Sequence, residues 1–213
     1  NMLYEKNKDS LSENAKEFLQ RMNSASKRMS GLINDLLNFS RLSRTEESFG
    51  AVDLNNVLAE IKNDFELIIA QKNATIASDK LPVIEAIPLQ MNQLLYNLMG
   101  NALKFTHDDT PPVINISCSL ASTETKEANT LPVDDVYYQI VFQDNGIGFN
   151  EEYSSKIFEI FQRLHVRSEY EGTGIGLALV NKIILNHRGR ITAKSQEGKG
   201  ASFTMLLPAK HTL

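Results

Sequence analysis

The sequence predicts an α+β fold: a two-layer α/β sandwich in which helices cover one face of a single mixed sheet, preceded by a long helix. Two observations lead to this fold class. Beyond residue 50 the expected helices and strands alternate, and the strands mostly have one apolar face, which is the pattern of a sheet covered on one side. Before residue 42, apolar residues recur with helical spacing. We therefore expect two domains, residues 1–45 and residues 46–213.

The early stretch, residues 11–42, is predicted to form one helix with a heptad repeat. The spacing of its seam alternates between four and three residues, through Leu11, Ala15, Phe18, Met22, Ala25, Met29, Leu32, Leu36 and Phe39. Such a seam supercoils with partner helices, and an amphipathic helix that lies on its own domain seldom keeps a strict heptad for so long. We therefore expect a homodimer formed through residues 11–42.

The elements after a polar linker, Arg41–Gly50, follow from hydrophobic periodicity and from turn residues. Helices are predicted at 54–70, 88–105 and 174–187, and strands at 75–77, 83–85, 113–120, 136–144, 190–195 and 202–207. Pro88 opens the second of these helices, as proline often does in a first turn. The last two strands are predicted to form a hairpin, and residues 121–135 a polar loop.

The composition is that of a globular protein, with 42% hydrophobic and 23% charged residues in a chain of 213. The formal net charge of −4 provides no basic face, so no nucleic-acid partner is expected. No apolar run approaches a membrane span and no secretory signal opens the chain. The single cysteine, Cys118, fits a reducing compartment, so a cytoplasmic location is expected. Because the chain opens with Asn1, we expect a piece of a longer protein, with any membrane association in the missing N-terminal part.

Three polar residues follow one line along the predicted helix at 88–105: Asn97, Asn101 and Lys104. Asparagine is a poor helix former, and a solvated helix face usually carries Glu, Lys or Gln. Mg²⁺ offers a reason for them, because it takes oxygen ligands, keeps several waters and often takes its other ligands from substrate phosphates. One asparagine carbonyl suffices as the protein ligand, and Lys104 can reach a phosphate as a point charge.

Asp144 ends a predicted strand on its buried face, in phase with Ile140 and Phe142. A carboxylate between sheet and helices needs a hydrogen-bond donor, and the exocyclic amino group of adenine is one candidate. The Asn145-Gly146 turn by itself also suggests an Asx-type cap, which would serve the same carboxylate. Gly148 would let the backbone approach a flat base closely.

A second glycine-rich stretch, Gly172-Thr173-Gly174-Ile175-Gly176-Leu177, opens the helix predicted at 174–187. Backbone amides at a helix N-terminus bind phosphate, with the helix dipole behind them. The stretch is neither a P-loop nor the dinucleotide fingerprint, and tight packing of helix on sheet would also explain its glycines. In this order, the polar line, Asp144 and the two glycine stretches predict a pocket for adenine, Mg²⁺ and a triphosphate.

Four stretches in this order resemble the boxes of sensor histidine kinases. Residues 97–105 resemble the N box, 144–148 the G1 box, 157–161 the F box and 172–177 the G2 box. The similarity covers residues 50–208. It implies the Bergerat (HATPase, GHKL) ATP-binding fold, shared with gyrase, heat-shock-90 and mismatch-repair ATPases. The helix at 11–42 resembles the second helix of the family's dimerisation and phosphotransfer domain, and the short lid at 161–165 looks like that of phytochrome-type kinases.

The resemblance also implies roles for the matched residues. Asn101 is the expected Mg²⁺ ligand and Asp144 the adenine anchor, while Asn97 and Lys104 are the expected catalytic residues. The nucleotide is expected to contact Asn97, Asn101, Lys104, Asp144, Gly146, Gly148, Phe161, Arg163, Gly172, Thr173, Gly174, Ile175, Gly176 and Leu177. The segment 163–172 is expected to be the ATP lid, from which Arg163 or Arg167 would reach the γ-phosphate.

One feature departs from the family. Its phosphoacceptor is a histidine on the first dimerisation helix, whereas the histidines here are His107, His165, His187 and His211. We therefore expect that most of the first helix is missing, and that the chain as given does not phosphorylate itself.

The expected function is that of the ATP-binding catalytic portion of a two-component sensor histidine kinase. The intact protein would transfer the γ-phosphoryl group of ATP to its own histidine and then to an aspartate of a response-regulator receiver domain. An ATPase of the same fold would use a glutamate one turn before the Mg²⁺ asparagine, where Asn97 cannot act as a base. A pure interaction module is disfavoured by Asp144 and the glycine boxes, and a protein serine kinase of this fold by the heptad helix.

Overall fold

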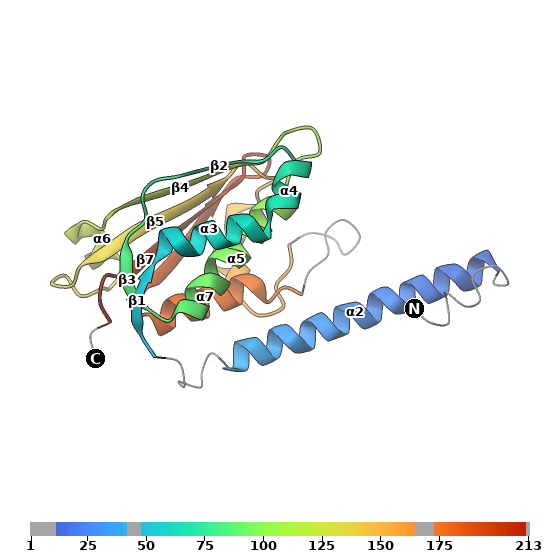
Figure 1. Cartoon of the computed structure of the whole chain (residues 1–213), viewed down its shortest axis with the longest axis horizontal. Helices are drawn as coiled ribbons and strands as arrows, with labels where there is room; N and C mark the ends of the chain where they lie inside the picture. Colours follow the sequence, from blue (N-terminus) through green and yellow to red (C-terminus); the bar gives the residue numbers. More distant parts are fainter. Residues whose placement is uncertain (1–11, 42–47, 165–172, 212–213) are drawn as a thin grey trace.

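The long helix predicted at residues 11–42 is present as α2 (Glu13–Arg41). The computed structural model describes residues 12–41, 48–164 and 173–211, so the predicted linker lies largely outside the described residues. The Ser12 side chain accepts a hydrogen bond from the Ala15 N–H (3.3 Å) and begins the helix. The N-terminal part of α2 extends beyond the rest of the molecule, whereas its C-terminal part runs along α7 (Gly176–Asn186) (Figure 1).

A mixed sheet forms the second layer, as the sequence predicts. In the described chain it has five strands in the order β2-β4-β5-β7-β6. Their bounds are β2 (Thr75–Ser78), β4 (Val113–Leu120), β5 (Tyr137–Asp144), β6 (Arg190–Ser195) and β7 (Ala201–Pro208). β2 runs parallel to β4, the other neighbouring pairs are antiparallel, and β6–β7 is the predicted C-terminal hairpin.

The expectation of a single sheet is wrong. The strand predicted at 83–85 is β3 (Val83–Ala86), which pairs antiparallel with β1 (Gly50–Asp53) in a separate two-stranded sheet. β1 lies at the end of the polar linker, and a strand this short carries too few alternations to be recognised. Its last residue, Asp53, caps the next helix by accepting a hydrogen bond from the Asn55 N–H (2.9 Å).

In the part of the chain that the structure describes, three helices cover one face of the five-stranded sheet: α3 (Leu54–Asp64), α5 (Pro88–Lys104) and α7 (Figure 1). The helix predicted at 54–70 is divided, because Phe65 leaves the helical conformation (φ −96°, ψ 7°) and α4 (Glu66–Gln71) follows it. The Phe65 ring packs against Tyr96 of α5, with the ring centroids 4.7 Å apart. Periodicity continues across such a break, so the sequence did not indicate it.

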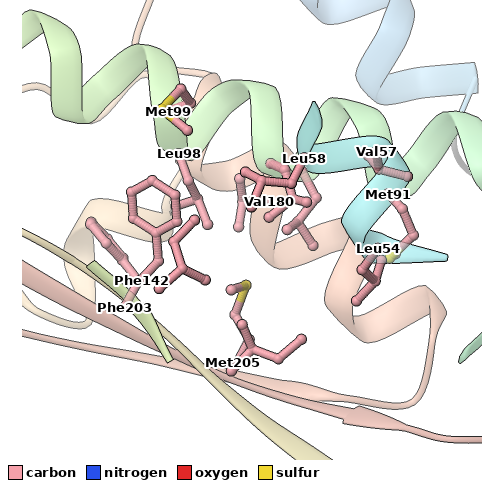
Figure 2. Packing of buried hydrophobic residues seen from close by; sticks show 14 of the residues in the cluster. Leu54, Val57, Leu58, Met91, Leu98, Met99, Phe142, Val180, Phe203 and Met205 are labelled. Carbon is pink, nitrogen blue, oxygen red and sulfur yellow. The ribbon is translucent and has the colours of Figure 1, made fainter. Parts of the chain in front are cut away.

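The core lies between these helices and the sheet. Leu98 and Val180 point from α5 and α7 toward Phe142, Phe203 and Met205 on the strands (Figure 2). The opposite face of the sheet is polar on its outer strands, with exposed Asn115, Ser117 and Ser119 on β4 and exposed Thr192 and Lys194 on β6. Tyr137 of β5 and Leu206 of β7 form a small separate apolar cluster there with Leu131. This distribution confirms the prediction that helices cover one face of the sheet.

The loop predicted at 121–135 contains a short helix, α6 (Thr123–Ala128), capped by the Ser122 side chain. Lys126 is buried, and its ammonium group donates hydrogen bonds to the main-chain oxygens of Val133 and Asp135. The polar composition of this segment gave no apolar periodicity from which α6 could be predicted. The helix is stabilised by the Ser122 cap and by the hydrogen bonds of Lys126 to main-chain oxygens that follow it. In the described part of the chain, no helix is long and apolar enough to cross a membrane.

His187, at the end of α7, connects this helix to the start of α5. Its Nε2 accepts a hydrogen bond from the Ile87 N–H (3.1 Å), so Nδ1 carries the proton and donates it to the Ile183 oxygen (2.8 Å). Burial lowers the pKa of His187, although the Ile183 hydrogen bond opposes this effect. His187 is therefore a neutral structural histidine.

Candidate functional site

A cavity of about 250 Å³ opens beside the helix layer at the end of β5. The predicted residues that line it are Asn97, Asn101, Lys104, Asp144, Gly148, Arg163, Thr173, Gly174, Gly176 and Leu177. Segments far apart in the sequence thus meet in one place, as the order of the boxes suggested. The structure adds Phe105, Phe149, Ile157, Gln162, Leu164, Ala201 and Phe203 to the lining.

Some residues expected at the nucleotide do not line this cavity. Ile175 is buried directly before α7, and Phe161 is 57% exposed to solvent. Gly146 packs against the main chain of Phe105. Gly172 and Arg167 lie outside the described residues.

Asp144 has the environment that the sequence predicts. Its Oδ1 accepts hydrogen bonds from the Gly146 N–H (2.9 Å) and the Ala201 N–H (3.2 Å). The first of these is the Asx-type turn that the Asn145-Gly146 pair suggested, so the turn and a ligand role are compatible. Burial raises the pKa of Asp144, and the two hydrogen bonds oppose that shift. Because both bonds end on Oδ1, Oδ2 is the carboxylate oxygen that can accept a bond from a ligand.

The glycines around Asp144 are required by contacts between two loops. A Cβ on Gly148 (φ +61°) would lie 2.2 Å from the Gln196 oxygen, and a Cβ on Gly200 (φ +86°) would lie 2.0 Å from the Asp144 oxygen. Both glycines therefore combine a left-handed backbone with a close main-chain approach. For Gly148 this contact, rather than approach to a base, accounts for the residue.

Asn97, the first residue of the polar line of α5, lies against α7. The Asn97 side-chain nitrogen donates to the Gln93 oxygen of its own helix (2.7 Å). Its Oδ1 lies so close to α7 that a Cβ on Gly176 would be 2.7 Å from it. Lys104 lies over the Phe105 ring, with Nζ 4.4 Å from the ring centroid. Asn101 and Lys104 thus present polar groups to the cavity beside an aromatic wall.

The N-terminus of α7 supplies amides to the same cavity. Ile175 precedes the helix and makes no side-chain capping bond, and the first helical bond runs from the Leu179 N–H to the Ile175 oxygen (2.8 Å). The amides of Gly176 and Leu177, which line the cavity, therefore have no acceptor within the helix. Such an N-terminus is suited to hold a phosphate group.

A metal ion here would depend on few protein ligands. Among the described residues, no group of three or more His, Cys, Asp or Glu side chains is placed to hold a metal. The Asn101 carbonyl fits Mg²⁺, which commonly takes its other ligands from water and substrate phosphates.

Two protein families match different parts of the chain. Residues 86–211 match the family of histidine kinase-, DNA gyrase B- and HSP90-like ATPases, and residues 1–45 match the His Kinase A (phospho-acceptor) domain. Cyanobacterial phytochrome A of Nostoc sp. is 36% identical over 200 residues, which are 94% of this chain and 24% of that protein. The chain spans about a quarter of the length of the first curated relatives it matches.

Solved structures share the fold. The crystal structure of full-length ShkA in complex with AMPPNP superposes with a TM-score of 0.67 at 23% identity, covering 95% of this chain and 41% of that one. The catalytic domain of histidine kinase ThkA superposes with a TM-score of 0.60 at 25% identity, covering 76% of this chain and 97% of that one.

Proposed function

The chain belongs to the sensor histidine kinase family, and on that premise we propose that residues 46–213 are an ATP-binding catalytic domain following a dimerisation and phosphotransfer segment at residues 1–45. The intact protein transfers the γ-phosphoryl group of ATP to a histidine, and then to an aspartate of a response-regulator receiver domain. Its use of ATP favours a cytoplasmic location. The observation that carries the proposal is that one cavity joins a partly buried carboxylate, the α5 polar line and the uncapped start of α7.

Each group of the cavity has a part in this function. Asp144 accepts the adenine amino group through Oδ2, since Oδ1 is occupied by two amides. The phosphates are held by the first turn of α7, by Thr173 and Gly174 before it, and by Lys104. Arg163 reaches them from the lid. Asn101 would be the protein ligand of Mg²⁺, and the bound ion would neutralise phosphate charge. The protein contributes mainly positioning and electrostatics, because phosphoryl transfer needs little covalent help.

We infer that the acceptor histidine of the proposed reaction is not among residues 1–45. Residues 1–45, which match the phospho-acceptor domain, contain no histidine. His187 does not suit the role, because it is buried and both ring nitrogens are hydrogen-bonded.

Hydrolysis of ATP by this site is a weaker alternative. The position where an ATPase of this fold carries its general base holds Asn97, an amide that has no proton-accepting role near neutral pH. Its nitrogen donates to Gln93, and its oxygen borders Gly176, so the side chain joins α5 to α7.

The Mg²⁺ assignment is tested by Asn101→Ala. We expect Mg²⁺ to strengthen ADP binding to the wild type about tenfold, or ~1.4 kcal/mol, and to leave the affinity of Asn101→Ala unchanged, because the side-chain carbonyl is lost. Calorimetric titration with Mg²⁺ or with EDTA measures both affinities. Asn92→Ala, on the same helix but away from the cavity lining, is the control. A full Mg²⁺ response in Asn101→Ala would remove this assignment.

Dimerisation through α2 is supported by its exposed apolar stripe. Phe18, Met22, Met29 and Ile33 are 64%, 67%, 58% and 59% exposed, respectively, and lie within the predicted seam or beside it. A stripe of large apolar side chains at heptad spacing is stabilised when partner helices cover it. The proposal is that a second copy of the chain is that partner.

Met22→Asp is therefore expected to raise the dimer dissociation constant about a hundredfold or more, because it places a carboxylate from each copy in the apolar seam. Sedimentation equilibrium over a range of concentrations measures the change. Ser24→Asp adds the same charge two residues away, outside the seam, and should have little effect. A wild-type chain that stays monomeric at every concentration would contradict the proposed dimer.

A further inference from the structure

Ser195, the last residue of β6, binds two loops with one hydroxyl group. Its Oγ accepts a hydrogen bond from the Phe149 N–H (2.8 Å) and donates one to the Gly200 oxygen (2.7 Å). Phe149 belongs to the loop that follows β5, and Gly200 to the turn between β6 and β7. We call these two bonds the Ser195 clasp.

The same two loops meet at further points. The Gly198 N–H donates to the Ile147 oxygen (2.7 Å), and the Ala201 N–H donates to Asp144 Oδ1 (3.2 Å). The main chains approach so closely at Gly200 that no Cβ fits there. Asp144 therefore accepts one hydrogen bond from the loop that follows it and one from Ala201, the first residue of β7, whose position depends on how the preceding turn lies.

We propose that Ser195 is a positioning residue for adenine recognition and acts through Asp144. The clasp fixes the turn, the turn places the Ala201 N–H on Oδ1, and the carboxylate is then held with Oδ2 presented to the cavity. This inference rests on the proposed ATP-binding function. It adds a residue that does not line the cavity and that motif reasoning did not single out.

The chemistry of the site supports this role. Without the Ser195 hydroxyl, the Phe149 N–H and the Gly200 oxygen must either hydrogen-bond to water or change position. Either change weakens the contact between the two loops. A carboxylate that has lost one of its two fixing amides samples other rotamers, so a ligand has to order it again on binding. The effect is confined to the base end of the site, because Asn101 and the start of α7 belong to other elements.

The first test measures ADP affinity by calorimetry. Ser195→Ala is expected to weaken binding about tenfold, Ser195→Thr to restore most of the affinity, and Ser202→Ala to match the wild type. Ser202 is a fitting control, since it lies on β7 opposite Lys194, next to Ser195. The ratio of affinities with and without Mg²⁺ should be unchanged in Ser195→Ala, whereas general loosening of the domain would alter it. Equal ADP affinities for wild type and Ser195→Ala would overturn the inference while the proposed function stood.

The second test needs no nucleotide. Amide hydrogen exchange at Phe149, Gly198 and Ala201 is expected to accelerate at least tenfold in Ser195→Ala and to remain as in the wild type in Ser202→Ala. Unchanged exchange at these amides would overturn the clasp. If the wild type failed to bind ADP, the proposed function would fail, and the exchange measurement would still decide whether Ser195 holds the two loops together.

Discussion

Replacing Asp144 with asparagine is expected to weaken ADP binding at least about a hundredfold, or ~2.7 kcal/mol. The reason lies in the hydrogen bonds of the carboxylate. The amides of Gly146 and Ala201 both donate to Oδ1, so the amide oxygen of an asparagine would take that position. Its NH₂ group would then face the adenine amino group, and two donors would oppose each other. Calorimetric titration of ADP measures the loss.

The stability of the same variant separates a binding defect from misfolding. Burial raises the pKa of Asp144 above its ordinary value of 3.8, so the folded state holds this proton more strongly than the unfolded state. The stability that the protonated carboxyl contributes is present below the pKa of the unfolded state. It is lost as the pH rises through the higher pKa of the folded state. At pH 7 the ionised carboxylate therefore destabilises the fold, and Asp144→Asn should be at least as stable as the wild type.

Urea denaturation at pH 7 and near pH 4 tests this linkage. The advantage of Asp144→Asn over the wild type is expected to shrink at the lower pH, because a larger fraction of the wild-type carboxyl is then protonated in the folded state. An Asp144→Asn variant that binds ADP as well as the wild type would remove Asp144 as the adenine anchor. A variant markedly less stable than the wild type at pH 7 would show that the carboxylate serves the fold instead.

Gly146→Ala is expected to destabilise the protein by about 3 kcal/mol or more, in the absence of any nucleotide. The added Cβ would lie 2.1 Å from the Phe105 oxygen and 2.9 Å from Asp144 Oδ1. The Phe105 oxygen has little freedom to move away, because it accepts a hydrogen bond from the Ile147 N–H (3.0 Å). Relief of the clash would break that bond and displace the loop that carries Asp144.

Gly50→Ala is the matched control for this substitution. A Cβ on Gly50 would meet nothing within 4 Å, and the backbone there is not left-handed, so a change within about 0.5 kcal/mol is expected. Urea denaturation of both variants gives the comparison. If the two variants had equal stabilities, the G1-box glycine would not be required by contact with Phe105, and a ligand-based requirement would be favoured.

Local patterns were sufficient to predict most of the elements and part of the site. The apolar spacing of α2, α5 and α7 and the alternation in β4, β5 and β7 are properties of neighbouring residues, and each element formed close to its predicted bounds. A local pattern was also sufficient for Asn97, Asn101 and Lys104. Helical spacing alone places them on one line, and the structure has all three on the cavity wall.

Pairing and packing over long distances decided the rest. β1 forms because it pairs with β3, which comes after α3 in the sequence. The helix breaks at Phe65, whose ring packs against Tyr96 of α5. Ala201 and Phe203 line the cavity because β7 pairs with β5, which no local pattern announces. The G1-box motif marked Gly146 and Gly148 from the sequence. Only the tertiary structure revealed that opposing main-chain oxygens, those of Phe105 and Gln196, exclude a side chain at these positions.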